Sequence, residues 1–173
     1  MIKGEVLLTQ RVFRELMNAM AFPGVWKCLP EGCVEHIAYT LLDGYVSFSS
    51  DEEELALWIE RRTKSKRVAP QEADFLFLRK GTLPSLKVGT PEYPEKSATV
   101  IRLLKSEGEM LTLLLRGPGI ENFRVVEVQG LSPWEVKLIG ELNRNFPLGV
   151  DFVFVREDCC LFGLPRSVKV EVI

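Results

Sequence analysis

A glycine-rich turn is the first segment whose residue types suggest a binding site. Arg116, Gly117, Pro118, Gly119 and Ile120 follow the most apolar stretch of the sequence, and loops after buried strands often bind ligands in α/β proteins. The turn does not have the composition of a phosphate-binding loop, because Pro118 has no N–H to donate and no Lys-Ser or Lys-Thr pair follows. We expect a tight turn that uses the conformational freedom of glycine, with a ligand site as the alternative.

A pair of opposite charges flanks a predicted hairpin near the C-terminus. If Val155 pairs with Cys160, Asp151 lies opposite Leu164 and Arg166 lies just beyond it. The two charges can then meet at one rim of the sheet, either as an ion pair that closes the hairpin or as groups that face a ligand or a partner protein. The candidate ligand or partner rim comprises Arg116, Gly117, Pro118, Gly119, Ile120, Asn143, Gly149, Asp151 and Arg166.

The sulfur and imidazole groups give a weaker signal. Cys28, Cys33 and His36 are close enough in sequence to suggest zinc, but their spacing matches no strong zinc pattern, so ordinary packing is expected and no metal is predicted. Cys159 and Cys160 are neighbours on a predicted strand, where they would point to opposite faces. All four cysteines are expected to be reduced and to add little to stability. His36 is the one histidine of the chain and lies among apolar residues, so no catalytic residue is assigned.

The composition narrows the possible partners. The chain has 173 residues, with 22 basic and 24 acidic side chains and a net charge of −2, which leaves no excess of positive charge for binding nucleic acid. No apolar run approaches the ~20 residues that a membrane span requires. We therefore predict a cytoplasmic protein that binds neither nucleic acid nor membrane, folded as a single domain over residues 1–173.

The first predicted helix begins at an N-cap, Thr9, and ends before Pro23-Gly24. Its expected buried face consists of Phe13, Leu16, Met17 and Met20, which follow the i, i+3, i+4, i+7 spacing of an amphipathic helix.

A second helix start lies at Ser132-Pro133. Ser132 is the expected N-cap, Pro133 suits the first helical position, and Glu135 is expected to reach back to the cap. The buried stripe of this helix is predicted to be Trp134, Leu138 and Leu142.

Strand patterns fill much of the remaining chain. Glu107-Gly108 marks an expected hairpin between strands at 98–104 and 110–115, and the second of these is apolar enough to be covered on both faces. The segment 80–96 contains Gly81 and several other helix or strand breakers, and is expected to be a long loop. Helices and strands interleave in the first half and neighbouring strands dominate later, which predicts an α/β protein with a mixed β-sheet flanked by helices.

Short motifs with a distinctive order and spacing are spread over most of the chain. They are Phe13-Arg14, Leu16-Met17, Ala19-Met20 and Pro23-Gly24; Leu41-Leu42-Asp43; Ala73-Asp74-Phe75; Gly89-Thr90, Pro94-Glu95 and Ser97-Ala98-Thr99; Gly117-Pro118-Gly119-Ile120; Asn143 with Phe146-Pro147-Leu148-Gly149-Val150-Asp151; and Leu164-Pro165-Arg166. Together these motifs resemble the PhnH family, whose members are subunits of the bacterial carbon-phosphorus lyase core complex.

The resemblance implies a fold like that of pyridoxal-phosphate-dependent transferases, but without the cofactor. It also implies a non-catalytic subunit that works with PhnG, PhnI and PhnJ and forms a homodimer when alone. In the phosphonate pathway of this family, a phosphonate displaces adenine from ATP to give ribose 1-phosphonate 5-triphosphate, and a separate radical iron-sulfur subunit cuts the C–P bond. The alternative is a stand-alone enzyme or sensor that binds a phosphorylated small molecule at the rim formed by Gly117 to Ile120, Asp151 and Arg166.

Overall fold

A seven-stranded mixed sheet forms the centre of the computed structural model, which describes residues 2–80 and 82–173. Its strand order is β1-β9-β8-β5-β4-β2-β3, and the strands from β8 to β3 run parallel to one another. The strands are β1 (Lys27–Cys28), β2 (Ser47–Ser50), β3 (Lys66–Arg67), β4 (Phe75–Leu78), β5 (Thr99–Leu103), β8 (Asp151–Val155) and β9 (Cys160–Leu164).

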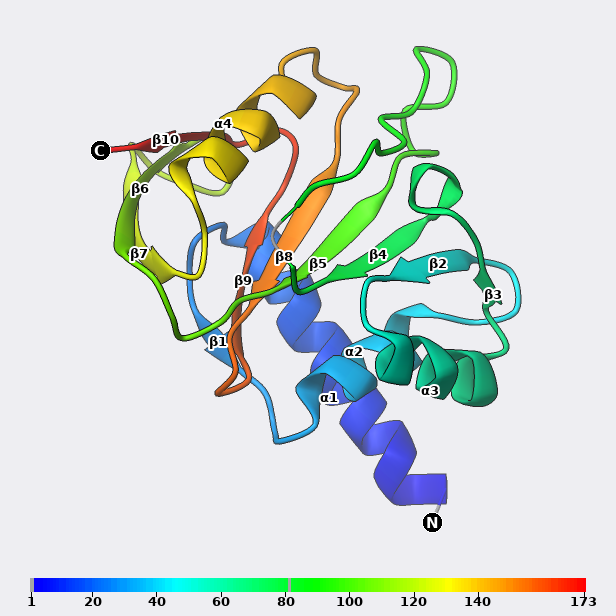
Figure 1. Cartoon of the computed structure of the whole chain (residues 1–173). Coiled ribbons are helices and arrows are strands. Elements are labelled where there is room, and N and C mark those ends of the chain that lie inside the picture. Colours follow the sequence, from blue (N-terminus) through cyan, green and yellow to red (C-terminus); the bar gives the residue numbers. More distant parts are fainter. Residues whose placement is uncertain (1, 81) are drawn as a thin grey trace.

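Helices cover one face of this sheet, and a second sheet with one helix covers the other (Figure 1). The first face carries α1 (Ile2–Ala21), α2 (Cys33–Leu41) and α3 (Glu53–Thr63); a 3-10 turn, η1 (Pro70–Glu72), precedes β4. The second sheet is antiparallel with the order β10-β6-β7, and helix α4 packs beside it. Its elements are β6 (Met110–Arg116), β7 (Arg124–Gln129), α4 (Pro133–Leu142) and β10 (Lys169–Val172).

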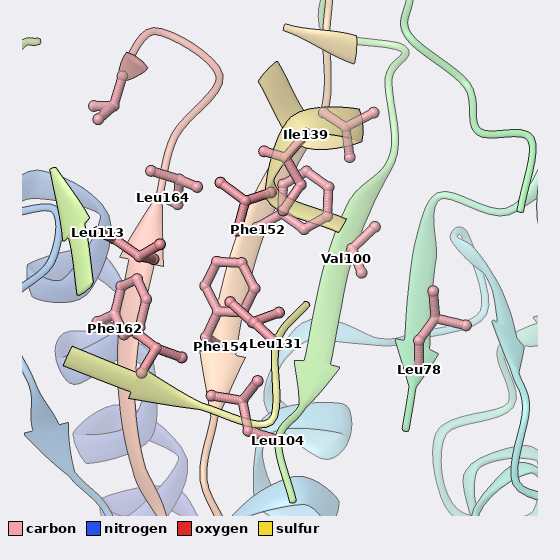
Figure 2. Close-up of a cluster of buried hydrophobic side chains, with 14 of the residues drawn as sticks. Leu78, Val100, Leu104, Leu113, Leu131, Ile139, Phe152, Phe154, Phe162 and Leu164 are labelled. Carbon is pink, nitrogen blue, oxygen red and sulfur yellow. The ribbon is translucent and has the colours of Figure 1, made fainter. Parts of the chain in front are cut away.

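Alternation along β8 shows how two cores share one strand. Phe152 and Phe154 point to the side of the second sheet, whereas Val153 and Val155 point to the helices, and all four side chains are buried. Figure 2 shows Phe154 between Phe152 and Phe162 of β9, and the ring centroids of Phe154 and Phe162 lie 4.9 Å apart. A continuous apolar strand of this kind is stable only when both faces are covered.

The predicted α/β class with a mixed sheet and flanking helices is confirmed. The hairpin expected at Glu107-Gly108 is wrong, because β5 pairs with β4 and β8 in the large sheet while β6 pairs with β7 and β10. Strand β6 is also not covered on both faces: its burial alternates, with Leu111, Leu113 and Leu115 facing the core. The described residues between β4 and β5 form a long connection, as predicted, and its one β-bridge pairs Val88 with Ser97. Gly81, which was part of that prediction, lies outside the described residues.

The first helix is longer than predicted, and only half of its predicted face is buried. It begins before Thr9, whose hydroxyl donates to the carbonyl of Glu5 at 2.8 Å instead of capping the helix. Leu16 is buried and Met20 packs partly buried against the core, as predicted, whereas Phe13 and Met17 are 51% and 57% exposed. Val12 and Ala19 complete the buried face, so the hydrophobic spacing identified the helix but misplaced its start and part of its core-facing side.

Helix α4 begins as predicted, but its buried stripe differs. The Ser132 hydroxyl accepts the backbone N–H of Glu135 at 3.1 Å, and Pro133 is the first helical residue. The Glu135 carboxylate does not reach back to the cap; it forms a buried ion pair with Arg102 of β5 at 2.6 Å. Burying Glu135 turns Trp134 outward, so that Trp134 is 63% exposed and Val136 and Ile139 are buried instead.

Candidate functional site

Asp151 and Arg166 meet at the edge of the sheet where the parallel strands β5 and β8 begin. The Arg166 guanidinium donates to both carboxylate oxygens of Asp151, with Nη2 at 2.5 Å from Oδ2 and Nε at 3.2 Å from each oxygen. The Arg166 backbone N–H donates to the same carboxylate at 2.8 Å. Only 15% of the Arg166 side chain and 22% of the Asp151 side chain are exposed, so this bidentate pair is largely buried.

The same guanidinium fastens two further segments of the chain. Arg166 Nη1 donates to the carbonyl of Pro94 at 2.9 Å and lies 3.5 Å from the carbonyl of Pro147. Pro94 belongs to the connection before β5, and Pro147 follows a cis peptide bond in the connection before β8. Because each nitrogen of the guanidinium has a partner within the chain, the arrangement serves first to tie three loops together.

The hairpin register differs by one residue from the predicted one. Val155 pairs with Leu161 and Phe152 with Leu164, so Asp151 lies opposite Pro165. The turn is one residue longer because the Asp158 carboxylate accepts the backbone N–H of Cys160 at 3.1 Å and Cys159 adopts a left-handed conformation with φ 64°. The longer turn still brings Asp151 and Arg166 together.

Asn143 and Gly149 fix the backbone just before β8. The Asn143 side chain accepts the Val150 N–H at 2.7 Å and donates to the Val150 carbonyl at 3.0 Å. Gly149 has φ 142°, and a Cβ there would lie 2.3 Å from the Asn143 side-chain oxygen and 3.2 Å from Cβ of Arg166. This position therefore needs glycine for both its backbone conformation and its space.

The glycine-rich turn from Arg116 to Ile120 is a structural turn in its observed contacts. A Cβ at Gly117 would lie 2.9 Å from the carbonyl oxygen of Ser167, and one at Gly119 would lie 2.3 Å from the carbonyl oxygen of Ala21. The turn thus packs between the residue after Arg166 and the end of α1. The structure brings Asn143, Gly149, Asp151 and Arg166 together. Gly117 lies against Ser167, next to Arg166 in the chain, whereas Gly119 lies against the end of α1 and Ile120 packs against the core beneath the second sheet.

A second carboxylate at the same edge of the sheet, Asp74, belongs to one of the family motifs but was not predicted to be a site residue. Asp74 accepts hydrogen bonds from the Lys87 amine at 2.5 Å and from the Ser47 hydroxyl and backbone N–H at 2.7 and 2.8 Å. Partial burial raises the pKa of Asp74, but the hydrogen bonds from Lys87 and Ser47 together outweigh it and hold the pKa below its ordinary value. Asp74 is therefore an ionised anchor, joining the start of β4 to β2 and the loop before β5.

A hollow lies at the opposite edge, beyond the carboxyl ends of β2, β4, β5 and β8. It has a volume of about 780 Å³ and includes Asp51, Arg79, Lys80, Arg156 and Glu157 among its lining residues. Asp51 accepts the backbone N–H groups of Arg79 at 2.9 Å and Lys80 at 2.8 Å. The signal that could have predicted this pocket is that a charged residue directly follows each of the parallel strands β2, β4 and β8, at the edge where α/β proteins bind ligands.

The four cysteines contradict the expectation of free thiols. Cys28 is bonded to Cys160, and Cys33 is bonded to Cys159. Cys159 and Cys160 do not pair with each other, as their opposite directions predicted. The zinc alternative at Cys28, Cys33 and His36 is not supported, because two of its three ligands are in disulfides and the described residues contain no group of three or more side chains arranged for a metal.

No helix in the described part of the chain has both the length and the apolar composition that crossing a membrane requires.

Comparison with known proteins agrees with the motif resemblance. The profile of a family described as bacterial phosphonate metabolism protein (PhnH) matches residues 2–171. The chain is 32% identical over 151 residues to the putative C-P lyase subunit protein HtxG of Stutzerimonas stutzeri, covering 84% of this chain and 77% of that protein. It is 28% identical over 185 aligned positions to the alpha-D-ribose 1-methylphosphonate 5-triphosphate synthase subunit PhnH of Rhizobium meliloti (strain 1021), covering 96% and 92%. With nearly its whole length matched and the Asn143, Gly149, Asp151 and Arg166 motifs folded into one partly buried cluster, this chain belongs to the PhnH family of bacterial phosphonate metabolism proteins.

Proposed function

We propose that this chain is a subunit of a carbon-phosphorus lyase core complex, supporting alkylphosphonate catabolism without catalysing a step by itself. The family match over residues 2–171 carries the proposal. Both relatives above are named as subunits, one of a C-P lyase and one of a triphosphate synthase. The partners that follow from the family are PhnG, PhnI and PhnJ.

The structure supports a docking role through helix α1, which carries apolar side chains on two different sides. Val12 and Leu16 face the core and are buried. Val6, Phe13 and Met17 lie on another side and are 48%, 51% and 57% exposed; we call these three residues the outer face of α1. A helix that is apolar on both sides is normally covered on both sides.

A shallow groove runs beside the outer face of α1. It has a volume of about 590 Å³ and lies between α1 and α2, with Val6, Phe13 and Tyr39 among its lining residues. Figure 1 shows the N-terminal half of α1 extending beyond the sheets, where another subunit can approach it. We therefore place the main contact with a partner subunit on this outer face.

The alternative is a stand-alone enzyme or sensor for a phosphorylated ligand at the Asp151–Arg166 rim. The geometry gives it less support, because the Arg166 guanidinium already bonds to Asp151, Pro94 and Pro147 of its own chain. Binding a phosphoryl group there would require breaking these hydrogen bonds. A thermal-shift screen with ATP, pyridoxal phosphate and alkylphosphonates tests the alternative, which predicts a raised melting temperature with at least one of them.

Co-expression with PhnG, PhnI and PhnJ, followed by size-exclusion chromatography, tests the subunit proposal. We expect this chain to elute with the partners in a stoichiometric complex. Elution of the chain entirely apart from all three partners contradicts the proposal, as does turnover of a phosphonate or nucleotide by the isolated chain.

Several finer features of the resemblance are part of the same proposal. They are a sheet arrangement like that of pyridoxal-phosphate-dependent transferases without the cofactor, a single domain over residues 1–173, a cytoplasmic location and a homodimer in the absence of partners. Light scattering of the isolated chain distinguishes a homodimer from a monomer.

A further inference from the structure

We propose that Cys28, Cys33, Cys159 and Cys160 form a reversible dithiol-disulfide modification site that clamps the α1–α2 connection to the β8–β9 turn. Both disulfides join the same two segments: Cys28 and Cys33 flank the connection that enters α2, and Cys159 and Cys160 are adjacent at the hairpin turn. All four cysteines of the chain take part. The site lies away from the Asp151–Arg166 cluster, at the other end of β8 and β9.

The backbone brings each pair together through contacts of its own. Strands β1 and β9 are antiparallel, and Cys28 is the register partner of Cys160. The next residue, Leu29, donates its backbone N–H to the carbonyl of Cys159 at 2.9 Å. Cys33 is the first residue of α2, and its Cα lies 5.6 Å from that of Cys159, inside the usual range for a disulfide.

The clamp holds a segment that has few other contacts. Strand β1 contains only two residues and lies at the edge of the sheet. The N-cap position of helix α2 is Gly32, which has no side chain to cap the helix, and the disulfide of Cys33 anchors its first turn covalently. Cys33 and Cys159 also line the pocket at the carboxyl edge of the sheet. Opening the clamp therefore frees one wall of this pocket.

Thiol–disulfide exchange can begin at Cys28, because it is the exposed cysteine of the four. Cys28 is exposed, whereas Cys33, Cys159 and Cys160 are 3%, 8% and 8% exposed. An external thiolate reaches the Cys28 sulfur first, and the freed Cys160 thiolate is then next to the remaining pair in the chain. In the oxidising direction, two thiols of each pair give up two protons and two electrons, and one molecule of oxidised glutathione takes them up to become two molecules of glutathione.

The parallel arrangement of the bridges predicts non-additive stability. Each bridge alone closes a loop of well over a hundred residues, with sequence separations of 132 and 126. Once one bridge is present, the other closes only the short ring through 28–33 and 159–160, and the stabilisation grows with the logarithm of loop length. Removing a second bridge therefore lowers the melting temperature about twice as much as removing the first.

The serine variants measure this difference. We expect Cys28→Ser/Cys160→Ser and Cys33→Ser/Cys159→Ser each to lower the melting temperature of the oxidised protein by about 5–10 °C, and the four-serine variant by about 15–25 °C. Wild type in a reducing buffer should melt close to the four-serine variant. Equal melting of oxidised wild type and the four-serine variant overturns the clamp.

Alkylation of the full chain tests whether the modification forms. After incubation with oxidised glutathione and denaturation, N-ethylmaleimide should add to no cysteine, and after reduction it should add to all four. Peptide mapping should recover Cys28 linked to Cys160 and Cys33 linked to Cys159. Free thiols after oxidation, or a Cys159–Cys160 bond, overturns the proposal.

Hydrogen exchange tests whether the bonds control the segment they join. We expect reduction under native conditions to speed amide exchange at 29–36 and 156–160 while leaving β5 unchanged. Identical amide exchange in the oxidised and reduced proteins overturns the proposed clamp. Stoichiometric zinc in the reduced wild type and none in the four-serine variant also overturns it, since the thiols would then be metal ligands.

Discussion

The guanidinium of Arg166 donates from Nη2 to Oδ2 of Asp151 at 2.5 Å, and the backbone N–H of Arg166 donates to the same carboxylate at 2.8 Å. Asp151 is the first residue of β8 and Arg166 follows β9 directly, so the pair closes the open end of a hairpin at the centre of the protein. The further bonds of Arg166 to Pro94 and Pro147 make this end the point where three family motifs meet.

The pair should show strong energetic coupling. Because both side chains are mostly buried, Arg166→Ala or Asp151→Ala each leaves an unpaired charge and should destabilise the protein by about 2–4 kcal/mol. The double variant should cost clearly less than the sum, giving a coupling of about 1–3 kcal/mol. Urea denaturation of the four proteins measures it, and additive losses would contradict the described pairing.

Gly149→Ala should destabilise the protein because its backbone is in a region that favours glycine and the added Cβ meets the Asn143 oxygen at 2.3 Å. We expect a loss of about 2–3 kcal/mol in urea denaturation. Gly140→Ala is the matched control: Gly140 lies inside α4 with nothing within 4 Å of an added Cβ, so it should stabilise by about 0.5–1 kcal/mol. Losses of the same size at both positions would refute the steric account.

The buried Arg102–Glu135 pair should be costly to break. Only 4% and 3% of the two side chains are exposed, so Glu135→Leu leaves a buried guanidinium without its carboxylate and should cost about 3–5 kcal/mol. Adding Arg102→Met should recover part of this loss. The recovery is incomplete because the carbonyls of Arg79, Leu103 and Gly130 lose their donor. Urea denaturation measures both losses. If the double variant is less stable than Glu135→Leu alone, the destabilisation by Glu135→Leu does not come from the unpaired charge of Arg102.

Stability should fall in acid partly through Asp74. Its pKa in the folded protein lies below the ordinary value, so the folded state binds this proton more weakly than the unfolded chain does. This contribution is present above about pH 4 and is lost as the pH falls through the folded pKa. Asp74→Asn and Lys87→Gln should each flatten the decline of the urea midpoint between about pH 5 and pH 2. An unchanged acid slope in both variants would show that Asp74 does not contribute.

Local patterns in the sequence were sufficient for several elements. The β8–β9 hairpin follows from two apolar runs around a polar turn. Ser132 and Pro133 identified the start of α4, since capping depends on neighbouring residues alone. The meeting of Asp151 and Arg166 was also accessible because it is a hairpin contact.

Contacts between residues far apart in the sequence could not be predicted from such local patterns. Glu135 was expected to bond to its own helix, but Arg102, 33 residues away, competes for it, and this turns Trp134 outward. Phe13 and Met17 have the spacing of a core face, yet they are on the exposed side of a helix whose buried face lies one step away. The cysteine pairs, separated by 132 and 126 residues, depend on the register of β1 against β9, which no local pattern defines.

The subunit role is tested most directly by charging the outer face of α1. Phe13→Glu/Met17→Glu should retain the fold by circular dichroism, because both side chains are more than half exposed, but should weaken binding to the co-expressed partner subunits at least tenfold, measured by titration. Trp134→Glu on the opposite side of the sheet is the matched control and should bind like wild type. Wild-type affinity of the α1 variant would contradict the placement of the interface, and absence of binding by the wild-type chain would contradict the subunit role itself.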